Sequence, residues 1–335
     1  MKKIAIGIDI GGTNSVFGAV DAEGTIFAEG SIRTSDYPSF DHYPQYIEAM
    51  CSGIRSLISG LGFNYELVGI GIGAPNAAFH RGVIEKPTNL WKFPQGMAGG
   101  EEMRVFPIVE DMKRNFPECE DVVVTNDANA ATIGEMMFGA ARGMKDFVVV
   151  TLGTGLGSGF VAGGEMIYGR DGMAGELGHM NVVRGGRECG CGLRGCLECY
   201  VSATGITRTA VELMCEMRDP SPLRELPVEK IESLTIAKAA AAGDAISKEA
   251  FRRTAEVLGQ ALADTIAITT PEAIILFGGL AKAGDILFKP TFEYMEANTI
   301  PVLRGKTKLL ASGVQDGNIA ILGSAALIWQ RLSVE

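Results

Sequence analysis

The sequence predicts an α/β protein of two related domains with a cleft between them. The main observation is a pattern that occurs twice, about 140 residues apart: strand, glycine-rich loop, strand, tight turn, strand. The second observation is the length of 335 residues, which suffices for two separate hydrophobic cores. We expect a small α/β domain at 1–125 plus 316–335, and a large α/β domain at 126–315 that contains a loop rich in cysteine and glycine within residues 171–200.

The first copy of the pattern opens the chain. β-rich runs separated by Gly-Gly-Thr-Asn and by the turn Asp-Ala-Glu-Gly predict a β-meander over residues 4–10, 16–20 and 25–32. Apolar residues at helical spacing then predict a helix over 43–61. The remaining elements expected in this half are strands at 67–72 and 121–125 and helices at 105–116 and 127–138.

The second copy of the pattern begins near residue 147. Around a Gly-Thr-Gly-Leu-Gly loop and a Gly-Gly turn, we expect strands at 147–151, 159–162 and 165–168. The rest is mostly helical, with helices expected at 204–217, 235–242, 244–269 and 317–332. Two further strands are expected at 273–277 and 308–311, and a proline-containing surface excursion at 218–227.

The most informative segment is residues 171–200, where a histidine and several cysteines lie among glycines. One imidazole and three thiols form the ligand set of a closed Cys₃His zinc site, and this segment supplies them as His179, Cys189, Cys191 and Cys196. The intervening glycines suit tight ligand loops better than packed cysteines in a helix or strand. Seven cysteines are an odd number and we find no signal peptide, so a disulfide framework is not expected. Cys199 is expected to pack on a helix, with replacement of one thiol ligand as the alternative.

Two carboxylates, Glu176 and Glu198, flank these ligands. A metal ion that holds the loop would also fix where both carboxylates point. The expected result is a structural zinc ion that supports a site for a polyhydroxylated ligand.

Three glycine-containing loops follow predicted strands, where backbone N–H groups commonly hold phosphate. In the first, a carboxylate that can orient Mg²⁺ precedes two glycines and a hydroxyl: Asp9, Gly11, Gly12 and Thr13. The second contains Gly153, Thr154 and Gly155. The third contains Gly278 and Gly279. An adenosine could pack against these glycines, and the alternative is that they are simple turn residues. None matches the P-loop or the Rossmann fingerprint.

Asn126 and Asp127 stand between a predicted strand and a predicted helix. An Asp at such a boundary is most often an N-cap. The expected surroundings of Asp127 favour a different role, because phosphate loops would lie on one side of the cleft and Glu176 with Glu198 on the other. There, Asp127 is expected to be a general base that takes the proton of an acceptor hydroxyl.

Composition excludes several classes of function. The net charge of −10 and the pI of about 5.0 disfavour DNA or RNA as a partner. The apolar runs are too short to span a bilayer. Because a strand pattern begins at once, we expect no signal peptide and a cytoplasmic protein.

Taken together, these motifs resemble the ROK family of bacterial sugar kinases and repressors, within the actin-like ATPase (ribonuclease H-like) fold. The resemblance covers essentially the whole chain. The segment LGTGLGSGFVAGGEMIYGRDGMAGELGH at 152–179 is similar to the family signature, and CGCGLRGCLE at 189–198 is similar to its zinc loop.

Resemblance to the glucokinase-like members implies ATP-dependent phosphorylation of a hexose, with glucose the first expectation, at its 6-hydroxyl. Asp127 would be the base. The sugar hydroxyls would be held by Asn126, Glu176, His179 and Glu198, with Asn76 and Asn89 as further contacts. Asp9 and Thr13 would serve Mg²⁺ and phosphate, and the glycine loops the ATP phosphates. Closure of the two domains on the sugar and a homodimer are also implied.

Two segments depart from the family pattern. Asn76, in GAPNAAFHRG, stands where family members commonly have glycine, and the usual Asn-Leu-Pro-Gly-Trp segment reads Asn-Leu-Trp-Lys-Phe at 89–93. Both lie on the expected sugar side, so N-acetylmannosamine, N-acetylglucosamine, fructose, mannose and allose remain alternative substrates. A repressor is disfavoured because only eight residues precede Asp9, and a non-catalytic sugar sensor is disfavoured by Asp9 and Asp127.

Overall fold

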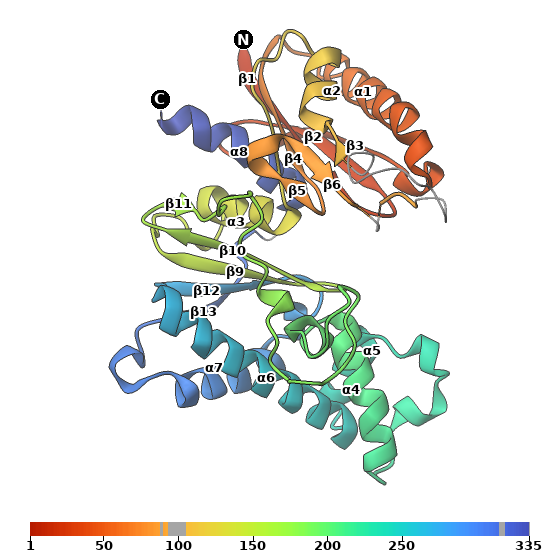
Figure 1. The fold of residues 1–335 in the computed structure, drawn as a ribbon, viewed down its shortest axis with the longest axis vertical. Coiled ribbons are helices and arrows are strands. Elements are labelled where there is room, and N and C mark those ends of the chain that lie inside the picture. Colours follow the sequence, from red (N-terminus) through yellow and green to blue (C-terminus); the bar gives the residue numbers. More distant parts are fainter. Residues whose placement is uncertain (88–89, 93–104, 315–318, 335) are drawn as a thin grey trace. The chain divides into compact units, whose positions relative to one another are not determined.

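The computed structural model describes residues 1–87, 90–92, 105–314 and 319–334. They form two compact units (Figure 1). The first unit comprises Met1–Gly143, Met166–Ala174 and Gly313–Glu335, and the second comprises Met144–Glu165 and Gly175–Ser312. Each unit is built on one five-stranded sheet.

The sheet of the first unit has the order β3-β2-β1-β4-β8. Its strands are β1 (Lys2–Ile10), β2 (Ser15–Val20), β3 (Ile26–Ile32), β4 (Tyr65–Gly73) and β8 (Val122–Thr125). β1, β2 and β3 pair antiparallel, whereas β1 with β4 and β4 with β8 are parallel. A separate small antiparallel sheet consists of β5 (Ala77–Ala78), β6 (Val83–Glu85) and β7 (Val105–Phe106).

Strand β1 contributes to two cores because successive side chains point to opposite faces. On one face, Ile4, Ile6 and Ile8 belong to the core formed with α1 (Tyr43–Ser59) and α2 (Ile108–Asn115). On the other face, Ala5 belongs to the core formed with α8 (Ile319–Val334). Helix α3 (Asp127–Phe138) also packs on α8.

The sheet of the second unit has the order β11-β10-β9-β12-β13. Its strands are β9 (Phe147–Leu152), β10 (Leu156–Ala162), β11 (Glu165–Met166), β12 (Ala273–Phe277) and β13 (Lys308–Ala311). β9 and β10 are antiparallel, and β12 is parallel to both β9 and β13. The central strands match those of the first sheet in order and direction, which confirms the predicted duplication.

The helices of the second unit are α4 (Ala203–Glu216), α5 (Ser233–Ala241), α6 (Ala245–Thr269) and α7 (Asp285–Asn298). Buried residues of β9, β12, α4 and α6 form one continuous core, and α6 and α7 lie along one side of the sheet (Figure 1). Among the helices of the described residues, none combines the length and the apolar character that a membrane span requires.

Most predicted elements are present within a few residues, but two of them differ, and one α-helix of the described residues was missed. The segment 105–116 begins as strand β7, and its helix starts only at Ile108, after Pro107. Strand β10 begins at Leu156, three residues before the expected 159, because the glycines after Gly155 continue the ladder with β9. Helix α7 was not predicted, since Pro290 lies inside it.

The compact units also differ from the expected domain boundaries. Helix α3, which the sequence analysis groups with the large domain, belongs to the first unit. The reason is its packing against α8, a contact between segments far apart in the chain. Residues 166–174 likewise belong to the first unit, where the ring of Tyr168 stacks on that of Phe79 at 3.8 Å between centroids.

Candidate active site and metal centre

The four predicted metal ligands converge in the second unit. Their donor atoms all lie within 4.8 Å of one another, in the group His179, Cys189, Cys191 and Cys196. His179 ends a 3₁₀ turn, Leu177–His179, and Cys196 directly precedes another, Leu197–Cys199. Two short turns and the loop between them therefore assemble the cluster.

The spacing of the donor atoms fits a tetrahedral zinc ion. The Sγ atoms of Cys191 and Cys196 are 3.7 Å apart, and Cys189 Sγ is 3.7 Å from His179 Nδ1. Zn–S and Zn–N bonds of ordinary length place such pairs about 3.6–3.8 Å apart. Cys199 lies outside the group: it is buried and its thiol donates to the carbonyl of Glu188 at 3.4 Å.

Glycines allow the metal loop to turn tightly. Gly192 and Gly195 have φ angles of +88° and +85°, which L side chains rarely adopt. The N–H of Gly192 donates to Cys189 O at 3.0 Å, which closes a turn between two ligands. A Cβ at Gly195 would lie 1.9 Å from Val183 O. Glycine is therefore favoured by the backbone conformation at Gly192, and by both the conformation and the available space at Gly195.

The two predicted carboxylates lie near different nitrogens of one imidazole. Glu198 Oε1 is 3.8 Å from His179 Nδ1, and Glu176 Oε2 is 3.9 Å from Nε2. Nδ1 faces the thiols, so Nε2 is the ring nitrogen available to a second ligand. This arrangement suits a histidine that binds metal through one nitrogen and a polar ligand through the other.

Glu198 also contacts the thiol of Cys189, which donates to Oε1 at 2.9 Å. Burial and this hydrogen bond raise the pKa of the Cys189 thiol far above its usual range, against the opposing effect of a backbone N–H. The thiol is therefore protonated without metal, and metal binding releases a proton.

Asn126 and Asp127 lie at the start of α3. Asn126 is the N-cap, and its side chain accepts from the N–H of Ala128 at 2.8 Å. Asp127 Oδ1 lies 2.9 Å from the same N–H. The Asp127 side chain is exposed to solvent, yet enough protein surrounds it for desolvation to raise the pKa of its carboxyl, while the N–H of Ala128 opposes the shift. A raised pKa suits a general base.

Asp9, at the end of β1, is electrostatically coupled to Asp127. Partial burial and the negative charge of Asp127 raise the pKa of Asp9 to about 6. A carboxylate whose ionised form is disfavoured by burial and by a neighbouring carboxylate provides a place where a divalent cation is stabilising.

The two glycine loops occupy equivalent positions, after β1 and after β9. In the first, the N–H of Gly11 donates to Asn14 O at 3.1 Å, and Thr13 O accepts from Ser35 N–H. In the second, the N–H of Gly153 donates to Gly155 O at 3.0 Å. A Cβ at Gly155 would lie 2.7 Å from Glu198 Oε2, so this loop touches the carboxylate beside the metal cluster.

The third glycine pair lies beside the second loop. Gly278 has a φ of +106°, and a Cβ there would lie 2.6 Å from Leu152 O. Leu280 N–H also donates to Leu152 O, at 3.1 Å. The end of β9 and the Gly278–Gly279 turn are thus packed together, with open space at Gly279.

Of the two segments that depart from the family pattern, the structure describes the one around Asn76. Asn76 is exposed and has a left-handed φ of 56°, and its side-chain amide donates to Lys86 O at 3.1 Å. Asparagine tolerates this conformation better than most residues, which explains how it replaces a glycine. Asn89 lies outside the described residues.

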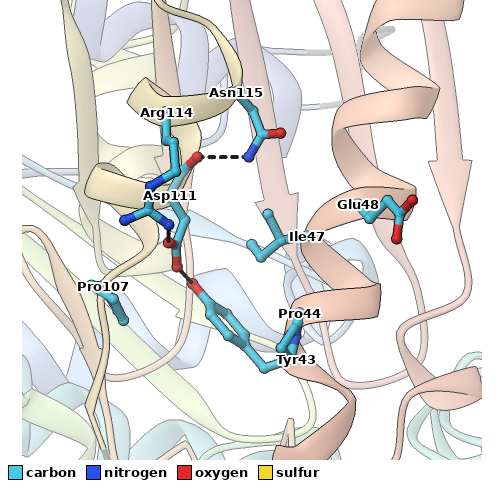
Figure 2. Close-up of a pocket in the computed structure, with 8 residues that line it drawn as sticks. All are labelled: Tyr43, Pro44, Ile47, Glu48, Pro107, Asp111, Arg114 and Asn115. Atoms are coloured by element: carbon cyan, nitrogen blue, oxygen red, sulfur yellow. Dashed lines mark hydrogen bonds and ion pairs between the residues drawn. The ribbon is translucent and has the colours of Figure 1, made fainter.

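A cavity of about 380 Å³ in the first unit lies between α1 and α2 and contains none of the predicted site residues (Figure 2). Its polar side chains bind one another: Tyr43 Oη donates to Asp111 at 2.9 Å, and Arg114 donates to Asp111 at 2.8 Å. The carboxylate of Asp111 is therefore held by its own neighbours.

Comparison with known proteins identifies the family. The family model described as "ROK family" matches residues 5–331. The chain belongs to the ROK family.

The glucokinase of Halalkalibacterium halodurans is 35% identical to this ROK protein over 304 residues, covering 88% of this chain and 86% of that protein. The glucokinase of Thermotoga maritima is 32% identical over 98% of both chains. Among solved structures, a ROK family glucokinase from Streptomyces griseus in complex with glucose and AMPPNP is 31% identical, with a TM-score of 0.76 over 98% of this chain and 99% of that chain. The fold is the actin-like ATPase fold that the sequence predicts.

The sequence reasoning missed residues that support the metal loop of this ROK protein. The guanidinium of Arg187 donates to Cys199 O at 2.7 Å and to Thr209 Oγ1 at 2.9 Å, and lies over the ring of Tyr200. Ser202 is fully buried and caps α4. Their partners are distant or belong to the backbone, so local spacing carries little signal for them.

Proposed function

We propose that this ROK protein is an ATP-dependent hexose kinase that phosphorylates glucose at its 6-hydroxyl. The observation that carries the proposal is similarity over nearly the whole chain to a glucokinase crystallised with glucose and AMPPNP. The proximity of His179, Cys189, Cys191 and Cys196, whose donor atoms all lie within 4.8 Å of one another, supports the proposal.

In this proposal, Asp127 accepts the proton of the sugar 6-hydroxyl while the oxygen attacks the γ-phosphorus of ATP. The bond from that phosphorus to the β–γ bridging oxygen breaks, and ADP leaves. A base in this position contributes about 10²–10⁴ in rate. The raised pKa of Asp127 supports the role, because a more basic carboxylate is a stronger proton acceptor.

The proposed sugar contacts are Asn126, Glu176, His179 and Glu198, with Asn76 and Asn89 as further ones. Carboxylates and an imidazole nitrogen match the hydrogen-bonding pattern of a polyhydroxylated ring. The neighbouring positions of Glu176 and Glu198 around the His179 ring support their part of this assignment.

On the nucleotide side, we propose that backbone and hydroxyl groups hold the ATP phosphates: Gly11, Gly12, Thr13, Gly153, Thr154 and Gly155. Gly278 and Gly279 would lie against the adenosine. Asp9 would orient Mg²⁺, which neutralises phosphate charge when bound. The coupling of Asp9 to Asp127 supports a cation there.

We propose zinc as the ion of the Cys₃His cluster, with a structural role. Four protein ligands leave no open position for a substrate. The ion would hold Glu198 and His179 in place for the sugar. We also propose a homodimer, on family resemblance, which size-exclusion chromatography with light scattering tests.

The test is a coupled assay of ADP release with Mg-ATP and a panel of sugars: glucose, mannose, fructose, allose, N-acetylglucosamine and N-acetylmannosamine. We expect the highest kcat/KM with glucose and the product glucose 6-phosphate. Preference for an N-acetylated sugar would overturn glucose as substrate. Folded, zinc-loaded protein that turns over none of them would overturn the kinase itself and favour a sensor.

A further inference from the structure

The N-terminus of helix α4 holds the second glycine loop by two carbonyls. The N–H of Ala203 donates to Gly153 O at 2.9 Å. The hydroxyl of Thr204 donates to Thr154 O, also at 2.9 Å. Both bonds run from consecutive residues of the helix to consecutive residues of the loop, so they orient two successive peptide planes.

The orientation of these planes determines where the loop's donors point. In a trans peptide, the C=O and the following N–H point in opposite directions. With both carbonyls tied to α4, the N–H groups of Thr154 and Gly155 point away from the helix. Neither N–H donates a hydrogen bond within the residues that the structure describes. Two adjacent free N–H groups aimed to one side form a cradle suited to an anion.

The Thr204 hydroxyl also contacts the segment that follows the metal loop. This hydroxyl lies 3.0 Å from that of Ser202. The buried Ser202 hydroxyl donates to Glu198 O at 2.7 Å and accepts from the N–H of Gly205 at 2.9 Å. Glu198 lies two residues after the ligand Cys196. A continuous set of contacts therefore joins the metal loop to the glycine loop.

We propose that Thr204 is a positioning residue that aims the Gly155 N–H at a phosphate of ATP. The inference rests on the proposed function, because it takes the anion to be the triphosphate of the kinase substrate. It adds that the segment after the metal loop serves nucleotide binding as well as the sugar side.

The experiment compares Thr204→Val, which keeps the shape of the side chain and removes the hydroxyl, with Thr204→Ser, which keeps the hydroxyl. Thr204 is exposed, so both variants are expected to fold. For Thr204→Val we expect KM for Mg-ATP and the dissociation constant for Mg-AMPPNP to rise about 2- to 12-fold, the range for one lost hydrogen bond. KM for glucose and zinc content should stay as in the wild type, and Thr204→Ser should restore nucleotide affinity.

A matched control is Thr207→Val on the same helix. Its hydroxyl donates to Ala203 O, not to the loop, so this variant should bind nucleotide as the wild type does. Unchanged nucleotide affinity in Thr204→Val would overturn the inference, as would an equal rise in KM for glucose or no recovery in Thr204→Ser. Wild-type protein without hexose kinase activity would overturn the proposed function instead, and AMPPNP binding would still test Thr204.

Discussion

At the scale of single residues, the surroundings of a carboxylate determine its pKa and its possible chemical role. The Ala128 N–H is shared between the Asn126 side chain, which is the N-cap, and one carboxylate oxygen of Asp127. The place of Asp127 between a strand and a helix alone favours an N-cap, and the base was predicted from the phosphate loops and carboxylates expected around it. The electrostatic effect of Asp127 on Asp9 could not be predicted, because Asp9 lies in β1 and Asp127 begins α3, and only the fold brings these elements together.

Asp127→Asn tests the base directly. The amide keeps the size of the side chain but cannot accept the hydroxyl proton, so kcat should fall about 10²–10⁴-fold. Glucose affinity, measured by calorimetry, should change little. Thermal melting serves as the control: a large loss of stability with activity reduced in proportion would indicate a structural residue.

Asp9→Asn tests the cost of the buried charge. Folding raises the pKa of Asp9 from 3.8 to about 6. Between these values the folded chain binds more protons than the unfolded chain, so the free energy of unfolding falls as pH rises through this window. Asn cannot ionise, so the free energy of unfolding of the variant does not fall in this way. The variant should be more stable than the wild type at pH 8, by no more than about 3 kcal/mol, with the difference disappearing near pH 4.

Urea denaturation at pH 8 and pH 4 measures this difference, and kcat should be lost in the same variant. A variant that is less stable at pH 8 would mean that the ionised Asp9 has a stabilising partner. In this prediction the substitution has opposite effects on stability and on activity, because the carboxylate proposed to orient Mg²⁺ is also the one whose ionisation costs folding free energy.

At the scale of elements, the metal loop contains little regular structure. Between the 3₁₀ turns at Leu177–His179 and Leu197–Cys199, its pairing consists of isolated bridges, Asn181 with Cys196 and Glu188 with Arg194. Such a segment buries little apolar surface of its own. We therefore expect the proposed metal ion and Arg187 to supply most of its order.

Cys196→Ser tests the metal. Cys196 is fully buried and Cys215 is exposed outside the cluster, so Cys215→Ser is the matched control. We expect Cys196→Ser to lose zinc by elemental analysis, and amide hydrogen exchange to accelerate across residues 177–205 but not in β1 or α1. Zinc content and exchange equal to those of Cys215→Ser would contradict the assignment.

The elements that sequence patterns predicted best are those whose local signals agree with their surroundings. Helix α3 was predicted to the residue, with a polar cap and a helical run. Helix α7 was missed because Pro290 argues locally against a helix, and packing on α6 outweighs that cost. The metal ligands were recoverable because their spacing is local, whereas Ser202, Thr204 and Arg187 act through backbone partners that no spacing reveals.

At the scale of the whole molecule, the C-terminal helix completes the first unit. Helix α8 packs on β1 and β4, strands from the opposite end of the chain. Two glycines make this approach possible: a Cβ at Gly7 would lie 2.0 Å from Ile321 O, and a Cβ at Gly71 would lie 1.8 Å from Ser324 O. In the sequence, Gly7 and Gly71 only weaken the strand patterns around them. The structure explains why glycine is needed there, because helix α8 packs closely on both positions.

Gly71→Ala tests this closure. The added methyl group meets backbone and not a flexible side chain, so α8 must shift as a body, which destabilises by about 1–3 kcal/mol or more. Gly60→Ala is the control, because a Cβ there meets its nearest atom at an ordinary 3.5 Å. Denaturant unfolding should show a clear loss for Gly71→Ala and almost none for Gly60→Ala. Equal stabilities would mean that α8 adjusts freely on the sheet. Since α8 also holds α3, whose first residue is Asp127, Gly71→Ala should reduce kcat more than Gly60→Ala does, even at temperatures where both variants are folded.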